Sequence, residues 1–246
     1  MGARAPTAVV PKTLLAWALP SGPSGHVRFT GAADGDFAVG QPADVLAVRR
    51  RALVPLPWTW LHQVHGDRVV VVDEPGARAG AYADAAVTTR VGAVLAIQTA
   101  DCIPVALIAD EGVVAAVHVG WRGLVAGVVE RAAEAVRRSG GRRVRAVIGP
   151  SIHPCCYEFG AADLDRVAAR YGDGVRATTR SGRRALDMPA AVASALAAMP
   201  DTEVVRAGLG CTGCGTPAMF SHRARGDTAR QAMVVWLEGS TRDAGP

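Results

Sequence analysis

Three residues on separate segments carry side chains that together suit metal binding or catalysis: His65, Cys102 and His118. Cys102 directly precedes an apolar run at 103–109, and His118 lies near the end of a second run at 113–119. A short acidic turn separates the runs, so we expect a β-hairpin, in which the start of one strand lies beside the end of the other. The thiol and the imidazole of His118 would then be neighbours, as in a metal site or a nucleophile with its base.

His65, in the sequence HQVHG, adds a second imidazole. Two histidines and one cysteine suit zinc and leave a fourth position for water, which zinc can convert into a nucleophile near neutral pH. A lone histidine at a strand end is more often a structural residue, so the prediction depends on the three residues together. His62 competes with His65, but it would point the other way on a strand because side chains alternate.

Two aspartates, Asp101 and Asp84, each have two interpretations. Asp101 is adjacent to Cys102 and would either orient a ligand histidine or move protons. The alternative is a carboxylate that caps a turn where a strand begins. Asp84 has the same two interpretations, and for both residues the sequence favours the structural one.

Arginines in two segments suit an anionic substrate. Arg122 lies in the turn GWRG at 120–123, where backbone N–H groups at a helix start and a guanidinium favour phosphate. The alternative is a plain turn with Arg122 in solvent. Arg223 and Arg230, with Arg225 between them, form a basic C-terminal stretch that either closes over a substrate or is a solvated surface.

The other cysteines form a vicinal pair, Cys155 and Cys156, and a C-x-x-C sequence, Cys211 to Cys214. A single C-x-x-C is typical of a redox pair or half of a zinc site. We interpret these thiols as structural or incidental. An odd total of five cysteines in 246 residues favours a reduced, cytoplasmic protein.

These residues need a framework of short strands and several helices. Strands are predicted at 26–30, 58–65, 69–72, 85–89, 94–99, 103–109, 113–119, 144–148 and 204–207; helices at 43–53, 124–138, 161–170 and 188–198; and a helix or strand at 228–237. Strands and helices that mix without strict alternation indicate an α+β (mixed α/β) fold. We expect one domain over 1–246, with residues 1–25 partly disordered.

Composition argues against several classes of partner. The net charge is +5, but the positive charge is almost all arginine, spread along the chain, and Lys12 is the only lysine. Aromatic residues make up 5%, too few for a nucleic-acid stacking platform. The apolar stretch 14–19 is too short to cross a membrane. We expect a monomer that acts on a small molecule, without nucleic acid or membrane partners.

Several motifs together resemble one family, the YfiH-like laccase-domain family, whose members are also called multicopper polyphenol oxidoreductases and purine nucleoside phosphorylases. The matching text is HQVHG, ADAAVTT, TADCIPV, AAVHVGWRG, IGPSIHPCCYEFG and FSHRARGDTARQA. The resemblance implies a compact layered sandwich with a mixed sheet flanked by helices. It also implies that His65, Cys102 and His118 are the metal ligands and catalytic residues.

The resemblance further implies a zinc-dependent purine nucleoside phosphorylase. Such an enzyme splits adenosine, inosine, guanosine or methylthioadenosine with phosphate into base and sugar-1-phosphate, and some members deaminate adenosine. In this scheme Asp101 transfers protons, while Arg122, Arg223 and Arg230 bind phosphate or substrate. Six histidines and no His-x-His are too few for several coppers, so zinc is preferred to copper.

Departures from the family pattern leave alternatives open. The segment VRFTGAADGDFAVG lacks the usual Gly-Gly-Val-Ser and Asn-Leu-Gly, and the C-terminal motif lacks one of two adjacent arginines. One alternative is a metal-free Cys-His hydrolase that cleaves an amide of a cell-wall precursor. Another is a copper-dependent polyphenol oxidoreductase. A third is a non-catalytic protein in which zinc only stabilises the fold, with Cys155, Cys156 or His62 as the fourth ligand.

Overall fold

Two six-stranded sheets form the centre of the protein, which we describe from a computed structural model covering residues 14–214 and 218–239. In spatial order the first sheet contains β1 (Leu14–Ala18), β2 (Ser24–Phe29), β14 (Gln231–Glu238), β7 (Val94–Thr99), β3 (Trp58–His62) and β5 (Ala81–Tyr82). The second contains β13 (Thr202–Arg206), β10 (Val144–Ile148), β8 (Ile103–Ala109), β9 (Val113–Val119), β6 (Ala85–Thr88) and β4 (Val69–Val72). Both sheets mix parallel and antiparallel pairs.

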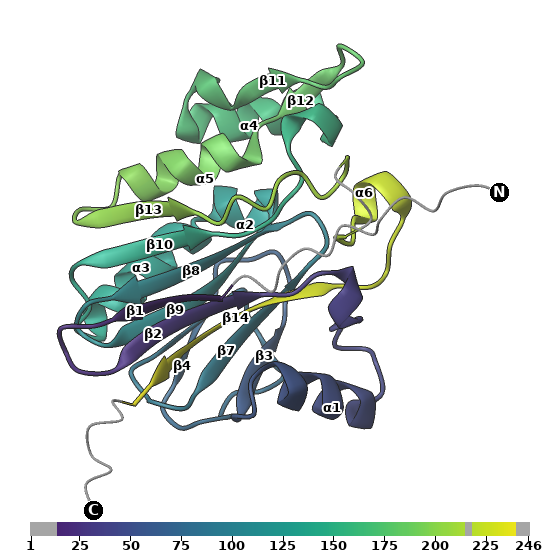
Figure 1. The fold of residues 1–246 in the computed structure, drawn as a ribbon. Helices are drawn as coiled ribbons and strands as arrows, with labels where there is room; N and C mark the ends of the chain where they lie inside the picture. Colours follow the sequence, from purple (N-terminus) through teal and green to yellow (C-terminus); the bar gives the residue numbers. More distant parts are fainter. Residues whose placement is uncertain (1–13, 215–217, 240–246) are drawn as a thin grey trace, which may run out of the picture.

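Helices cover the outer faces of the two sheets, except for a four-residue helix near the C-terminus that lies beyond the ends of the strands (Figure 1). They are α1 (Ala43–Leu53), α2 (Trp121–Ala126), α3 (Val128–Arg138), α4 (Ala161–Tyr171), α5 (Met188–Ala197) and the short α6 (His222–Arg225). Short 3-10 turns occur at η1 (Ala32–Asp34), η2 (Pro154–Cys156) and η3 (Asp173–Val175), and β11 (Arg176–Thr178) pairs with β12 (Arg184–Leu186).

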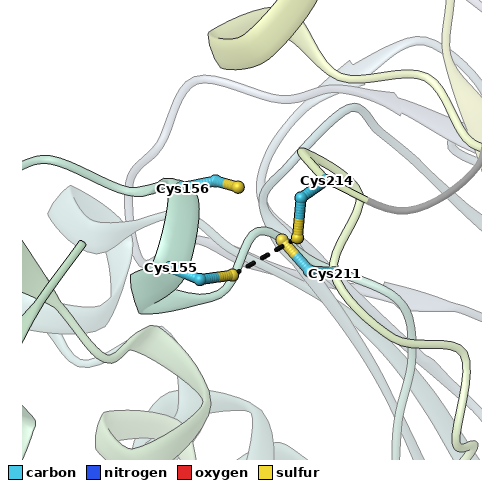
Figure 2. Close-up of side chains that lie close together, drawn as sticks. All are labelled: Cys155, Cys156, Cys211 and Cys214. Atoms are coloured by element: carbon cyan, nitrogen blue, oxygen red, sulfur yellow. Dashed lines mark hydrogen bonds between the residues drawn. The ribbon is translucent and has the colours of Figure 1, made fainter. Parts of the chain in front are cut away.

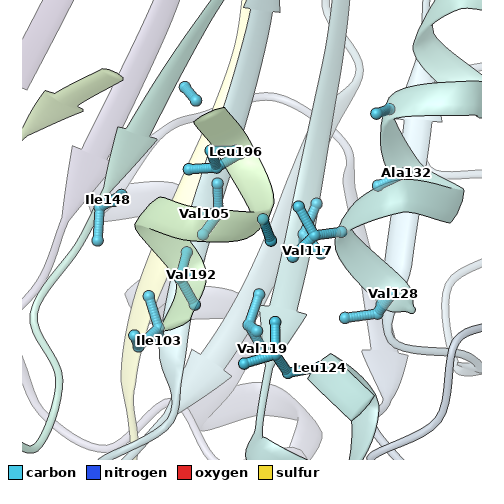
Figure 3. Close-up of a cluster of buried hydrophobic side chains, with 14 of the residues drawn as sticks. Ile103, Val105, Val117, Val119, Leu124, Val128, Ala132, Ile148, Val192 and Leu196 are labelled. Carbon is cyan, nitrogen blue, oxygen red and sulfur yellow. The ribbon is translucent and has the colours of Figure 1, made fainter. Parts of the chain in front are cut away.

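Alternate residues of β8 explain how the layers pack. Ala106 and Ile108 lie in the apolar core between the two sheets, whereas Val105 and Leu107 face the helices. The helix-side core joins this second sheet to α3, α4 and α5, and Figure 3 shows part of it, with Val117, Val128 and Val192 among its residues. Because both faces of the strand are buried, its sequence is an uninterrupted apolar run.

The structure confirms the mixed α/β class and the hairpin on which the site depends. β8 and β9 pair antiparallel, with Pro104 opposite His118 and Ile103 opposite Val119. The first residues before β8 therefore lie beside the last residues of β9. The predicted strands at 69–72, 94–99, 103–109, 113–119 and 144–148 have the observed bounds.

Other elements differ from the sequence-based expectations. The helix predicted at 124–138 starts earlier and divides into α2 and α3, because Gly127 adopts a left-handed conformation with φ 99°. Residues 231–237 of the ambiguous segment 228–237 belong to the central strand β14, and the sequence does not predict β1, β5, β11 or β12. The partial disorder expected for residues 1–25 cannot be compared over residues 1–13, which lie outside the described residues. Within the rest, Leu14–Ala18 forms a strand that pairs with β2.

None of the helices within residues 14–214 and 218–239 has the length and apolar character that a membrane crossing requires.

Candidate metal centre and the cavity around it

The fold brings His65, Cys102 and His118 together from three chain segments. Their possible ligand atoms all lie within 4.8 Å of one another, and Cys102 Sγ is 3.7 Å from His65 Nε2. His118 lies on β9, Cys102 directly precedes β8, and His65 follows β3 in a left-handed conformation with φ 59°. The predicted proximity of the three side chains is therefore present in the structure.

Gly120 leaves the space in which this cluster fits. A Cβ atom at position 120 would lie 2.5 Å from His65 Cδ2 and 3.3 Å from Cys102 Sγ. The first distance is far below van der Waals contact. The glycine that precedes Trp121 in the sequence GWRG therefore allows the backbone to approach His65 closely.

Asp84 holds two of the three residues in place. Its side chain is fully buried, its Oδ1 lies 2.8 Å from His118 Nδ1, and it accepts hydrogen bonds from the backbone N–H groups of His65 and Gly66 at 2.9 and 2.7 Å. Burial raises the pKa of Asp84, but these hydrogen bonds and the charge of His118 lower it below its ordinary value. Orienting a ligand histidine is one of the interpretations that the sequence offers for Asp84, but the sequence favours a purely structural role because β6 and β9 become neighbours only in the folded sheet.

The donor set fits a metal ion. Since Asp84 occupies Nδ1 of His118, the other ring nitrogen of His118 remains for a ligand bond, together with His65 Nε2 and the Cys102 thiolate. A carboxylate that fixes a ligand histidine in this way is typical of zinc sites. Two nitrogens and one sulfur leave a fourth position open, as in catalytic rather than structural sites.

Charge distribution in the cluster favours the thiolate. Burial raises the pKa of Cys102, but the charge of His118 and hydrogen bonds from both histidines lower it from 9.0 to about 6. Burial lowers the pKa of His118, but Cys102 and Asp84 raise it to about 9. The thiolate is the form of cysteine that ligates metals and attacks electrophiles.

Asp101 lies beside the cluster but directs its carboxylate to a neighbouring loop. It accepts hydrogen bonds from Thr212 Oγ1 at 2.7 Å, Ser221 Oγ at 2.6 Å and the backbone N–H of Arg223 at 2.6 Å. Its φ of 96° is left-handed, and its own carbonyl accepts from the N–H of Ile152. Three donors on one carboxylate make Asp101 an anchor for the loop that carries Arg223; proton transfer by Asp101 stays a prediction.

A cavity of about 560 Å³ opens above the three residues. Its wall includes His65, Cys102, His118, Asp101, Tyr157, Arg223 and Arg230. The N-terminal segment VRFTGAADGDFAVG, whose sequence differs from the family pattern, contributes Ala38, Val39 and Gly40 to this wall. The chain thus builds a cavity here without the family's usual N-terminal residues.

The three arginines proposed for phosphate binding occupy different places. Arg223 and Arg230 line the cavity; the guanidinium of Arg223 lies 5.1 Å from the Tyr157 ring and donates to the Glu158 carbonyl at 3.2 Å. Arg122 stacks 4.7 Å over Trp121 and is not among the described residues that line the cavity. Two of the three therefore line the same cavity as the cluster of His65, Cys102 and His118.

His62 points away from the cluster. Its ring stacks on Tyr82 at 4.9 Å and meets Trp60 edge-on at 5.3 Å. Within the described part of the chain, neither His62 nor another cysteine joins the ligand group around Cys102. The proposed fourth protein ligand, which a purely structural zinc site would need, is therefore not found there.

Comparison with known proteins identifies the family. The model of the family described as "Multi-copper polyphenol oxidoreductase laccase" matches residues 31–238. The chain belongs to this family. The match includes all the residues of the cluster and its cavity.

Members of this laccase-like family that resemble the chain bear a different name. A purine nucleoside phosphorylase of Mycobacterium tuberculosis is 40% identical over 213 residues, which cover 83% of this chain and 84% of the relative. Another, from Streptomyces griseus, is 40% identical over 222 residues, covering 88% and 89%.

Solved structures of the family share the fold. A DUF152 protein of Neisseria meningitidis superposes with a TM-score of 0.75 at 26% identity, covering 93% of this chain and 100% of that one. YlmD of Geobacillus stearothermophilus gives a TM-score of 0.75 at 24% identity, covering 93% and 97%. The predicted YfiH-like architecture is thereby confirmed.

Proposed function

We propose that this protein is a metal-dependent purine nucleoside phosphorylase. The observation that carries the proposal is that one cavity holds both the ligand set of His65, Cys102 and His118 and the cationic side chains of Arg223 and Arg230. A metal beside an anion-binding wall suits the attack of phosphate on a neutral nucleoside. The names of the relatives at 40% identity support the same activity.

In the proposed reaction a phosphate oxygen attacks C1′ of the sugar and the bond from C1′ to the base nitrogen breaks. The bonding electrons leave with the base, which takes up a proton, and the products are the free base and the sugar-1-phosphate. A bound metal would act as a Lewis acid in this cavity. Adenosine, inosine, guanosine and methylthioadenosine share the reacting bond, so all remain proposed substrates.

The protein's own residues would position and neutralise the reactants. Arg223 carries a charge that suits phosphate, and Asp101 fixes its backbone N–H. Arg230 lies on the same cavity wall, with Nη1 donating to the carbonyls of Thr228 and Ala229 at 2.8 and 2.9 Å. These carbonyls limit the motion of the Arg230 guanidinium, and the Glu158 carbonyl holds that of Arg223.

We also propose that the same site deaminates adenosine. Water would add at C6 of the purine and ammonia would leave, giving inosine. The three candidate ligands line a cavity large enough for a small molecule, and a water held by a bound metal there would suit a hydrolytic reaction as well. Asp101 and His222, both in the cavity wall, are proposed as proton carriers for either reaction.

Zinc is the metal we propose. Two imidazoles and one thiolate suit zinc, whereas multicopper oxidation needs several histidine-rich sites. Among the described residues, the group around Cys102 is the one candidate metal group that contains histidine. The residues therefore support a zinc-dependent reaction better than the multicopper oxidation for which the family is described.

A second candidate is a metal-free Cys-His hydrolase acting on an amide. The observation that favours it is the chain of contacts from Cys102 to His118 to Asp84, in which a buried carboxylate orients a histidine beside a thiolate. This order of nucleophile, base and orienting group is that of cysteine hydrolases. In this case Cys102 would attack the carbonyl carbon and His118 would protonate the departing amine.

The deciding experiment uses untagged protein, because a His-tag binds metal. Metal content is measured, and adenosine is incubated with and without phosphate while mass spectrometry follows adenine, inosine and ribose-1-phosphate. We expect phosphate-dependent adenine in the wild type and none in Cys102→Ala. The matched pair His65→Asn and His62→Asn tests whether the effect is specific to the cluster, since of these two histidines only His65 contacts Cys102.

Full turnover by Cys102→Ala or by His65→Asn would overturn the assignment. Activity that survives complete removal of metal, together with covalent trapping of Cys102 by substrate, would favour the hydrolase instead.

A further inference from the structure

Four of the five cysteines form a second cluster, separate from Cys102. The sulfur atoms of Cys155, Cys156, Cys211 and Cys214 all lie within 4.8 Å of one another, and Cys155 Sγ is 3.5 Å from Cys214 Sγ. Figure 2 shows the four side chains turned toward a common space between two chain segments. All four are free thiols rather than disulfides.

We infer that these four cysteines bind a structural zinc ion. Zinc–sulfur bonds of about 2.3 Å in a regular tetrahedron place the sulfurs about 3.8 Å apart. This value lies between the 3.5 Å that separates Cys155 Sγ from Cys214 Sγ and the 4.8 Å within which all four sulfurs lie. Four protein ligands close the coordination shell, which distinguishes this site from the three-ligand group at Cys102. The inference does not depend on the proposed enzymatic activity.

Backbone groups around the cluster support bound thiolates. The N–H of His153 donates to Cys211 Sγ at 3.3 Å. Such donors to the ligand sulfur are the usual outer-shell support of a metal–thiolate site.

Gly213 provides a second, geometric observation. A Cβ atom at position 213 would lie 2.7 Å from Cys156 Cβ and 3.2 Å from its sulfur. The glycine inside the C-x-x-C sequence thus lets the vicinal cysteines approach from the other segment. Two disulfides would require only pairwise contacts, whereas gathering all four sulfurs around one point is what a tetrahedral ion requires.

The two segments that the ion would join are both connected to the cavity wall, one through Tyr157 and the other through a hydrogen bond to Asp101. Cys156 is followed by Tyr157, and Cys211 is followed by Thr212, whose hydroxyl donates to Asp101 at 2.7 Å. Asp101 in turn holds the N–H of Arg223, whose guanidinium contacts the Glu158 carbonyl. Zinc in this cluster would therefore stabilise the wall that presents Arg223, without touching the reacting atoms.

The test isolates the cluster in the Cys102→Ala variant, so that metal at the first site does not contribute. We expect one zinc per chain, with an X-ray absorption first shell of four sulfurs at about 2.3 Å. In unfolded, chelated protein without reductant, all four thiols should react with a chromogenic thiol reagent. Adding Cys211→Ser and Cys214→Ser should abolish the zinc.

A folded Cys102→Ala protein without zinc, a first shell dominated by nitrogen or oxygen, or fewer than four reactive thiols would overturn the inference. If the serine variant does not fold, titrating the Cys102→Ala protein with an organomercurial replaces it. One zinc should then be released as four thiols react, and no release would overturn the site. Because Cys102→Ala is inactive under the proposed function, these readouts are independent of turnover.

Discussion

Asp84 Oδ1 lies 2.8 Å from His118 Nδ1, and both side chains are buried in the sheet. The same carboxylate accepts the backbone N–H of His65, so one residue orients two of the three candidate ligands. β6 and β9 bring this about, since the N–H of His118 also donates to the Asp84 carbonyl at 2.7 Å. The geometry of the candidate metal centre therefore depends on a residue that is not among those lining the cavity.

Replacing Asp84 with asparagine should weaken metal binding about 10- to 100-fold, the usual cost of losing a carboxylate behind a ligand histidine. The loss arises because the amide removes the negative charge that favours the required orientation of His118. Competition with a chromogenic chelator measures the affinity.

Asp67→Asn is the control for Asp84→Asn, because Asp67 is exposed and pairs with Arg131 at the surface. An Asp84→Asn affinity equal to that of the control would contradict the role assigned to Asp84. Thermal unfolding of both variants separates an effect on the ligands from general destabilisation.

Gly120→Ala should disrupt the cluster directly. The new methyl group would lie 2.5 Å from His65 Cδ2, so His65 or the β9–α2 turn must move. We expect loss of most metal binding and destabilisation of about 1–3 kcal/mol, typical of overpacking. Gly160→Ala is the matched control, since no atom lies within 4 Å of its added Cβ and its φ is −68°. Equal metal content in the two variants would show that the cluster tolerates the shift.

The hairpin that joins Cys102 to His118 could be predicted because its strands are buried on both faces. Continuous apolar runs with a short acidic turn have few alternative folds. Contacts between strands distant in sequence could not be predicted in this way. Asp84 reaches His118 only through sheet order, and the four-cysteine cluster unites residues 155–156 with 211–214 only through packing of two loops.

Two other differences between the sequence-based expectations and the structure concern the helix predicted at 124–138 and the arginines. Gly127 divides a segment whose helical spacing continues across it, because its φ of 99° fits a helix end and not a helix interior. For the arginines, residue type indicated an anion site, but only the fold separates Arg223, in the cavity, from Arg122, which packs on Trp121.

Alkylation of Cys102 in metal-free protein should report its lowered pKa. The thiolate reacts, so the rate should rise with pH and reach its midpoint at about 6 rather than at 9.0. Below that pH the thiol predominates and the rate should fall. Peptide mapping after iodoacetamide treatment measures this residue separately from the other cysteines.

His118→Asn should raise the alkylation midpoint, because the charge of His118 is the largest contribution that lowers the pKa of Cys102. His62→Asn should leave the midpoint unchanged, since His62 packs on Tyr82 away from the cluster. A wild-type midpoint near 9.0 would mean that His118 does not carry a proton in the metal-free protein.

Arg223→Ala should raise the KM for phosphate by about 10-fold or more, which corresponds to the loss of a charge-assisted hydrogen bond. The KM for the nucleoside should change less, because the guanidinium is proposed to meet the anion. Steady-state phosphorolysis with each substrate varied in turn measures both constants. Arg131→Ala is the control, since that side chain is 70% exposed and lies outside the cavity.

Arg122→Ala tests whether phosphate binds at the helix start after Gly120, as the sequence suggests, or in the cavity beside Arg223. If phosphate binds at the helix start after Gly120, removal of Arg122 should raise the KM for phosphate as much as removal of Arg223. The packing of Arg122 on Trp121, outside the cavity, leads us to expect a smaller change. An effect on phosphate confined to Arg122→Ala would move the anion site to that turn. Equal KM values for all three arginine variants would remove the support that Arg223 gives to phosphorolysis.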